Sequence, residues 1–263
     1  MCSAPAQITL PLDKSAQLDN GRNYSIKNAV ERKQKTARSK WFTRKFLRGM
    51  LRVENSQNRN GYFNTLKCAE VMYVNAHGRL VSKYCKNRWC LVCNRIRTAQ
   101  YINAYSPVVS VWREPYFVTL TVRSPYERDL KSVMNRMQSA FTSCVRSIKH
   151  AGFHFEAVRK IECTHNSIAQ TYHAHYHVLV NGADQAQRLS VLWLDRCQAR
   201  DLKAVESAQD VRRVRDTDNS LTELFKYFTK VLPKRAKQVD FTAQDRIFTA
   251  FRRKRVVQNY GLS

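Results

Sequence analysis

The chain has 263 residues and a formal net charge of +26, because it carries 46 Lys and Arg residues against 20 Asp and Glu residues. This excess favours a polyanionic partner, and no stretch approaches the roughly 18–20 apolar residues of a membrane-spanning helix. We therefore expect nucleic acid and no membrane. Residues 1–11 lack the basic start and apolar run of a secretory signal, so the eight Cys residues are expected to be thiols or metal ligands in a reducing cytoplasm.

The N-terminal part is predicted to be a basic arm followed by a short helix. Residues 1–40 are polar and basic with little periodicity, which predicts a poorly ordered arm. From Trp41 to Arg52, aromatic and apolar residues alternate with Arg and Lys in a pattern that suits a short amphipathic helix. Its basic face either contacts phosphates or is a solvated surface, and the sequence leaves both alternatives open.

A cysteine-rich segment follows inside a predicted module that spans residues 41–105. Tetrahedral zinc takes four soft ligands, and two Cys residues separated by two others grip an ion from a tight turn. CKNRWCLVC contains one such pair, so we predict a structural zinc site, the alternative being reduced, buried thiols. The candidate ligands are Cys68, Cys85, Cys90 and Cys93. Three arginines beside them are predicted to contact DNA: Arg88, Arg95 and Arg97.

Residues 106–263 are predicted to form the main domain, with a basic C-terminal tail. β-Branched and aromatic runs predict strands, and apolar residues at helical spacing predict helices. In chain order these are a strand at 116–122, a helix at 127–149, strands at 153–163 and 171–180, a helix at 185–197, a weak strand at 211–214 and a helix at 219–231. Adjacent strands between helices predict an α+β fold with a central antiparallel sheet flanked by helices, not a doubly wound parallel sheet.

The strand at residues 171–180 carries histidines at alternate positions. In YHAHYHVLV, His173, His175 and His177 share one face of the strand, because successive side chains point to opposite faces. Glu162 adds a carboxylate if its strand pairs with this one as a hairpin. Two imidazoles and one carboxylate leave open positions for a phosphate oxygen and suit Mn²⁺ or Mg²⁺. The spacing leaves open whether His173 or Glu162 is the third ligand, and the alternative is a polar strand with no metal.

The last predicted helix carries a candidate nucleophile. Glu223, Tyr227 and Lys230 are spaced i, i+4, i+7 and therefore share a face. A Tyr hydroxyl has a pKa of about 10, so it needs a metal-polarised phosphate or a nearby base to attack at neutral pH. Three apolar residues on a neighbouring face are predicted to anchor the helix to the core: Leu224, Phe228 and Val231.

Four motifs in this order resemble those of the plasmid rolling-circle replication initiators of the His-hydrophobe-His (HUH) endonuclease superfamily. They are YFVTLTV, IECTHN, YHAHYHVLV and ELFKYFTK. CKNRWCLVC resembles the branch that carries a cysteine-rich, zinc-like segment upstream. The resemblance implies that His175 and His177 bind the catalytic metal, and it places Glu162 where the family has an acidic residue that can complete the metal site. It also implies that Tyr227 is the nucleophile, assisted by Lys230 of the Tyr-x-x-Lys motif. By the same resemblance, Glu223 activates water for the closing step.

The resemblance implies a site-specific single-strand DNA endonuclease and strand transferase that initiates rolling-circle replication through a 5′-phosphotyrosine intermediate. The implied partners are a hairpin origin that is single-stranded at the nick, a host helicase and a host DNA polymerase, in the cytoplasm of a prokaryotic host. No phosphate-binding Gly-rich loop is present in the sequence, so no nucleotide cofactor is expected. Two alternatives remain: a transposase or relaxase with the same chemistry, and a non-catalytic zinc-ribbon DNA-binding regulator.

Overall fold

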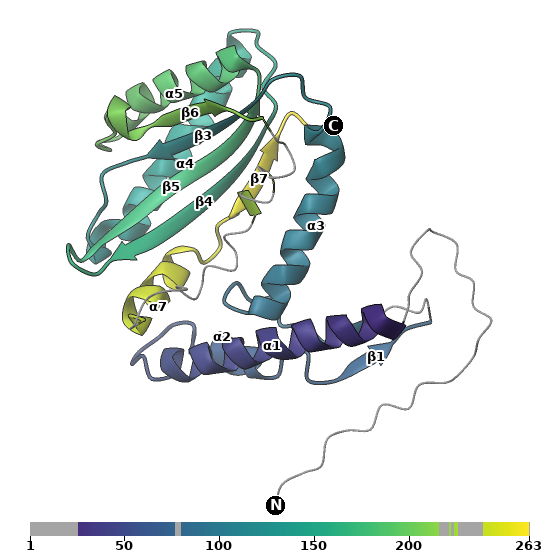
Figure 1. The fold of residues 1–263 in the computed structure, drawn as a ribbon. Coiled ribbons are helices and arrows are strands. Elements are labelled where there is room, and N and C mark those ends of the chain that lie inside the picture. The colour runs from purple at the N-terminus through teal and green to yellow at the C-terminus, as the bar shows by residue number, and fades with distance from the viewer. Residues whose placement is uncertain (1–25, 77–79, 216–220, 222–223, 226–238, 263) are drawn as a thin grey trace, which may run out of the picture.

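The computed structural model describes residues 26–76, 80–215, 221, 224–225 and 239–262. Its N-terminal elements are mostly helical. They are α1 (Ile26–Met50), α2 (Arg59–Leu66), the paired strands β1 (Met72–Val74) and β2 (Leu80–Ser82), and α3 (Leu91–Val109). Figure 1 shows that α3 leads from these elements toward the main sheet, while α1 lies across the lower end of α3. Among the described helices, none is long and apolar enough to cross a membrane.

The main sheet has five strands in the order β6-β3-β5-β4-β7, and every neighbouring pair is antiparallel. Its strands are β3 (Pro115–Thr121), β4 (Ala157–Asn166), β5 (Thr171–Asn181), β6 (Asp210–Arg213) and β7 (Val257–Tyr260). The accompanying helices are α4 (Glu127–His150), α5 (Ala183–Gln198), the short 3₁₀ turn η1 (Glu206–Ala208) and α7 (Phe241–Ala250). The predicted α+β class with a central antiparallel sheet is confirmed.

The two faces of the sheet pack against different elements. On one face, Tyr176 and Val178 of β5 join the large core built by α4 and α5, where Phe141 and Trp193 are fully buried. These helices cover that face in Figure 1. The opposite face, which we call the histidine face, carries the alternate β5 residues from His173 to Leu179. One end of the histidine face packs against α3 and the described part of residues 221–225.

The N-terminal helices are joined to the sheet domain through α7. The carboxylate of buried Asp245 accepts hydrogen bonds from Ser56, Asn58 and Tyr62, at 2.5, 3.2 and 2.5 Å. Burial and this carboxylate raise the pKa of the Tyr62 hydroxyl well above its usual value, so it stays a donor. Beside it, aromatic residues of α1 and α7 and the ring of Trp89 form one apolar cluster. These contacts fix α1 and α2 relative to the sheet.

Several elements differ from the sequence prediction. The helix predicted from Trp41 begins at Ile26, so residues 26–40 are helical where an arm was predicted. Among the side chains of residues 26–40 that the structure describes, the small residue Ser39 is the only buried one, so no apolar periodicity marks this half of α1. Helices α2, α3 and α7 and strand β7 were not predicted, and β4 begins at Ala157 instead of residue 153. The helix predicted at 219–231 is described only at 221 and 224–225, which are helical.

Candidate active site and metal centres

The register of the sheet brings the acidic and imidazole side chains together. Glu162 on β4 lies directly opposite His175 on β5, and Thr119 on β3 lies opposite His177. Because β5 is flanked by β3 and β4, its histidines project from the middle of the sheet. The short connection between residues 166 and 171 makes β4 and β5 a hairpin, as the pairing of Glu162 with the histidines required.

Three of the predicted ligands converge within 4.8 Å of one another: Glu162, His175 and His177. The two imidazole Nε2 atoms are 3.2 Å apart, and Glu162 Oε2 lies 3.7 and 3.9 Å from them. The Nδ1 atom of His177 faces the hydroxyl of Thr119 at 3.3 Å, and that of His175 faces the carbonyl oxygen of His173 at 3.3 Å. Such outer partners orient imidazoles for metal binding, so this donor set fits a divalent cation.

His173 is not part of this convergent group. Its Nδ1 atom lies 3.3 Å from the hydroxyl of Ser124, and its ring stacks on that of His175 with centroids 4.7 Å apart. Burial lowers the pKa of His173, which favours its neutral form. Of the two candidates for a third ligand, the geometry therefore favours Glu162.

Lys160, which was not predicted as a site residue, is a buried cation beside this convergent group. Its side chain is 2% exposed, and its ammonium Nζ lies 2.5 Å from Glu162 Oε1. This contact occupies one carboxylate oxygen while the other faces the two imidazoles. The signal was present in the sequence, because Lys160 and Glu162 are two residues apart on one strand and share a face.

The four cysteines also converge, with their Sγ atoms within 4.8 Å of one another. They come from separate elements: Cys68 follows α2, Cys85 follows β2, and Cys90 and Cys93 lie at the start of α3. The Sγ atoms of Cys68 and Cys93 are 3.5 Å apart, and those of Cys85 and Cys93 are 3.6 Å apart. The cluster contains no disulfide, since all four are free thiols.

The backbone around these cysteines has the geometry of a metal-binding turn. Ala69 and Lys86, which follow Cys68 and Cys85, have positive φ values of 54° and 58°. The backbone N–H of Lys86 donates to Cys93 Sγ at 3.3 Å, a bond that favours the thiolate. Hydrogen bonds from the other cysteines, Cys68 first among them, lower the pKa of the Cys85 thiol. Four converging sulfurs with N–H donors fit a tetrahedral zinc ion, and they leave no position for a substrate.

The three arginines predicted to contact DNA all make hydrogen bonds within the protein. The Arg88 guanidinium donates to the carbonyl oxygens of Phe251, at 2.6 Å, and of Lys254, and burial lowers its pKa. Arg97 donates to the carbonyl oxygen of Lys86 at 2.7 Å. Exposed Arg95 donates to the carbonyl oxygen of Lys35 in α1 at 2.7 Å. Each therefore has a structural role in the described chain, and their contact with DNA stays a prediction.

The predicted catalytic helix is described only in part. Glu223, Tyr227 and Lys230 lie outside the described residues, as do Phe228 and Val231. Leu221 and Leu224 are buried on the histidine face, as predicted for Leu224. Phe225 stacks on Tyr101 and Tyr105 of α3, with ring centroids 5.3 and 5.7 Å apart. These three described residues before Tyr227 are thus held on the same face of the sheet as His175.

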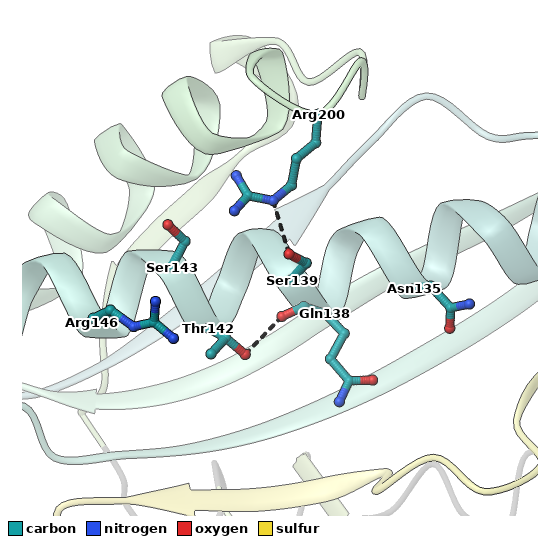
Figure 2. A pocket seen from close by; sticks show the side chains of 7 residues that line it. All are labelled: Asn135, Gln138, Ser139, Thr142, Ser143, Arg146 and Arg200. Carbon is teal, nitrogen blue, oxygen red and sulfur yellow. Dashed lines mark hydrogen bonds between the residues drawn. The ribbon is translucent and has the colours of Figure 1, made fainter.

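A shallow hollow of about 370 Å³ lies elsewhere, on the outer surface of α4. Figure 2 shows its polar lining, with Arg200 reaching over from the end of α5 to Ser139, 3.1 Å away. Because α4 covers the opposite side of the sheet, this hollow is separated from the histidine face. It brings no metal-ligating residues together.

Together, these features define an α+β protein with a Glu-His-His centre on an antiparallel sheet and an upstream four-cysteine cluster. Residues 79–262 match the family described as Replication protein, and since this is more than half of the chain, the protein belongs to that family. The predicted resemblance to plasmid replication initiators is confirmed at this level.

Two curated relatives illustrate the similarity, and both are named Protein rep. The one from Streptococcus pneumoniae serotype 2 is 31% identical over 103 residues, which are 37% of this chain and 32% of the relative. The one from Staphylococcus aureus is 28% identical over 160 residues, which are 56% of this chain and 69% of the relative. The match to the first relative thus covers about a third of that relative's length. No solved structure matches the chain significantly.

Proposed function

We propose that this protein nicks and rejoins one DNA strand to initiate rolling-circle replication of a plasmid or similar small replicon. The observation that carries the proposal is the convergence of Glu162, His175 and His177 on the face that also holds Leu221, Leu224 and Phe225. A phosphodiester bound there would lie on the face to which the described residues just before the Tyr-x-x-Lys motif are anchored. Family membership favours replication over transposition or plasmid transfer.

The chemistry is an in-line displacement at phosphorus. The Tyr227 oxygen loses its proton and forms a bond to phosphorus, and the bond from phosphorus to the 3′ oxygen breaks. The products are a 5′-phosphotyrosine ester and a 3′ end, which takes up a proton and can prime a polymerase. The reverse reaction rejoins the strand, and Glu223 accepts a proton from the water that hydrolyses the last ester.

The protein positions the reacting groups through the histidine face. Glu162, His175 and His177 would hold a divalent ion of the Mn²⁺ or Mg²⁺ type, and that ion would polarise the scissile phosphate. Lys160 holds one oxygen of Glu162, so that the other faces the imidazoles. Lys230 offsets the charge of the phosphate or lowers the pKa of the attacking hydroxyl.

We assign zinc to the four-cysteine cluster as a structural ion. The cluster joins the end of α2, the β1-β2 hairpin and the start of α3, which bury little apolar surface among themselves. An ion held by four thiolates would supply the stability that this small cluster lacks. Its binding contributes to folding, and the reaction does not pass through it.

The test is the formation of a covalent adduct with DNA. The protein is incubated with Mn²⁺ and single-stranded oligonucleotides tiled across the replicon that encodes it, and peptides are analysed by mass spectrometry. We expect DNA on the Tyr227 peptide, no adduct with Tyr227→Phe or His175→Ala, and a normal adduct with the control Tyr126→Phe, an exposed Tyr before α4. Folded, metal-loaded protein that forms no adduct on any strand would replace this proposal with a non-catalytic DNA-binding protein.

A further inference from the structure

Helix α1 presents a continuous exposed stripe of basic and aromatic side chains. Its inner side packs into the protein through buried Phe46, Leu47 and Met50. Its outer side follows helical spacing and consists of Arg38, Trp41, Arg44, Lys45 and Arg48, all exposed. We call these five residues the α1 stripe.

The α1 stripe is strongly positive and largely unneutralised. Every charged residue of α1 except Glu31 is basic, and Glu31 pairs with Lys35 in the preceding turns. Arg44 lies 3.9 Å from Glu70, a long contact between exposed side chains that contributes little. Within the part of the chain that the structure describes, no ion pair involves Arg38, Lys45 or Arg48. Maintaining this density of charge is most favourable beside a polyanion.

Trp41 lies in the middle of the stripe and is 58% exposed. The Lys45 ammonium lies 5.5 Å from the centroid of its ring, and Phe42 packs edge-on at 4.8 Å. These contacts hold the indole in place without burying it. A fixed, exposed aromatic ring among cations can contact bases while its neighbours contact phosphates.

The stripe is fixed in position relative to the histidine face but separate from it. Buried Asp245 joins the segment after α1 to α7, and Arg95 of α3 donates to the α1 carbonyl of Lys35. In Figure 1, α1 lies at the opposite end of α3 from the main sheet. A strand bound at the histidines therefore leaves the stripe available to another part of the same DNA.

We propose that the α1 stripe binds double-stranded DNA beside the nick site, with Arg38, Lys45 and Arg48 on phosphates and Trp41 toward the bases. The proposal rests on the proposed function for the nature of its ligand, but not on the nicking chemistry. The stripe runs from Arg38 to Arg48, about 15 Å along the axis of α1, so its side chains can face one stretch of duplex together. A convex helix fits the major groove, whereas single-strand sites follow a groove lined by aromatic rings.

The test is the salt dependence of duplex binding, measured by fluorescence anisotropy with the full-length protein. The probe is a labelled duplex of about 20 base pairs, longer than α1, compared with its single strand. The triple variant Arg38→Ala, Lys45→Ala, Arg48→Ala should lower the slope of log K against log salt by about 2–3, because each lost phosphate contact removes about 0.9. Trp41→Ala should weaken binding on the order of tenfold and leave the slope unchanged.

The matched control removes three exposed cations from α4 on the other side of the sheet, Lys131, Arg146 and Lys149. This variant should bind the duplex with the wild-type slope. An unchanged slope in the α1 variant, or an equal loss in the α4 variant, would overturn the proposal. A loss confined to the single-stranded probe would also overturn it, because the stripe would then be a single-strand site.

Nicking is measured separately on short single strands, which do not reach α1. If the α1 variants lose duplex binding while Tyr227-dependent nicking continues, both proposals stand. If the wild-type protein binds duplex through α1 but forms no adduct with any strand, the nicking proposal fails and the stripe remains. The two failures are therefore distinguishable.

Discussion

Replacing Lys160 by Met removes a buried positive charge from the histidine face and keeps a side chain of similar length. In the wild type, the ammonium lies 2.5 Å from Glu162 Oε1, and the two side chains are 2% and 12% exposed. Solvent therefore screens this pair little. Breaking a buried ion pair by removing one partner costs about 3–5 kcal/mol, because the remaining charge is left desolvated. The Met side chain fills most of the volume of the Lys side chain, so little stability should be lost to an empty cavity.

The loss should depend on metal. Glu162 Oε2 lies 3.7 and 3.9 Å from the imidazoles of His175 and His177, so a bound divalent cation would supply the counter-charge that Lys160 provides without it. We expect Lys160→Met to lower the free energy of unfolding by about 3 kcal/mol in EDTA. With saturating Mn²⁺ the difference should fall to about 1 kcal/mol, because without Lys160 the ion binds Glu162 more tightly and so stabilises the folded variant more than the wild type.

The assay is urea unfolding followed by circular dichroism, with EDTA and with Mn²⁺. Lys149→Met, on the exposed side of α4, is the control and should change stability by less than about 0.5 kcal/mol in both conditions. The double variant Lys160→Met, Glu162→Gln should recover much of the loss in EDTA, because no unpaired charge remains. Equal losses with and without metal would refute the electrostatic reasoning, as would a double variant no more stable than Lys160→Met.

Three further predictions concern the metal centres and the buried thiols. Glu162→Gln should weaken Mn²⁺ binding about tenfold or more by isothermal titration calorimetry. His173→Ala should have a much smaller effect, because His175 Nδ1 faces the backbone carbonyl of His173, which the substitution keeps; the reverse order would reassign the third ligand. Cys90→Ser should lower the zinc content measured by plasma mass spectrometry and destabilise the protein, whereas retained zinc would contradict the assignment. Burial raises the pKa of Cys144 and Cys197 to about 12, so both should resist iodoacetamide near pH 8 in the folded protein; rapid labelling would show that these thiols are accessible.

The histidine face could be predicted from the sequence because strand alternation and hairpin pairing are both local. Three histidines at alternate positions define one face of β5, and the short turn after residue 166 brings Glu162 opposite His175. The long α4 was predicted nearly to its ends because its buried residues recur at regular helical spacing. In each case one element buries one continuous stripe, so a single periodicity describes it.

Helix α3 could not be predicted in this way, because it packs against two different surfaces. Its first turn buries Val92 and Cys93 in the cysteine cluster, while its far end buries Val109 against the sheet. The residues between are half-buried or exposed, apart from buried Asn94, so no single buried apolar stripe runs along the helix. The spacing of Lys160 and Glu162 on one strand signalled that they share a face. The burial of Lys160 was set by tertiary contacts, and it could not be predicted because a Lys on a strand is usually exposed.

The double packing of α3 also gives the cysteine cluster a place in the architecture of the active site. Cys93 lies in the first turn of α3, and Tyr101 and Tyr105 stack on Phe225 further along the same helix. The hydroxyl of Thr98 donates to the carbonyl oxygen of Phe225 at 3.3 Å, which adds a polar contact to the stacking. An ion that fixes the start of α3 therefore also fixes the surface on which the segment leading to Tyr227 rests. In the proposed mechanism, an ion in the cysteine cluster would support the alignment of the nucleophile with the histidine face from the other end of α3.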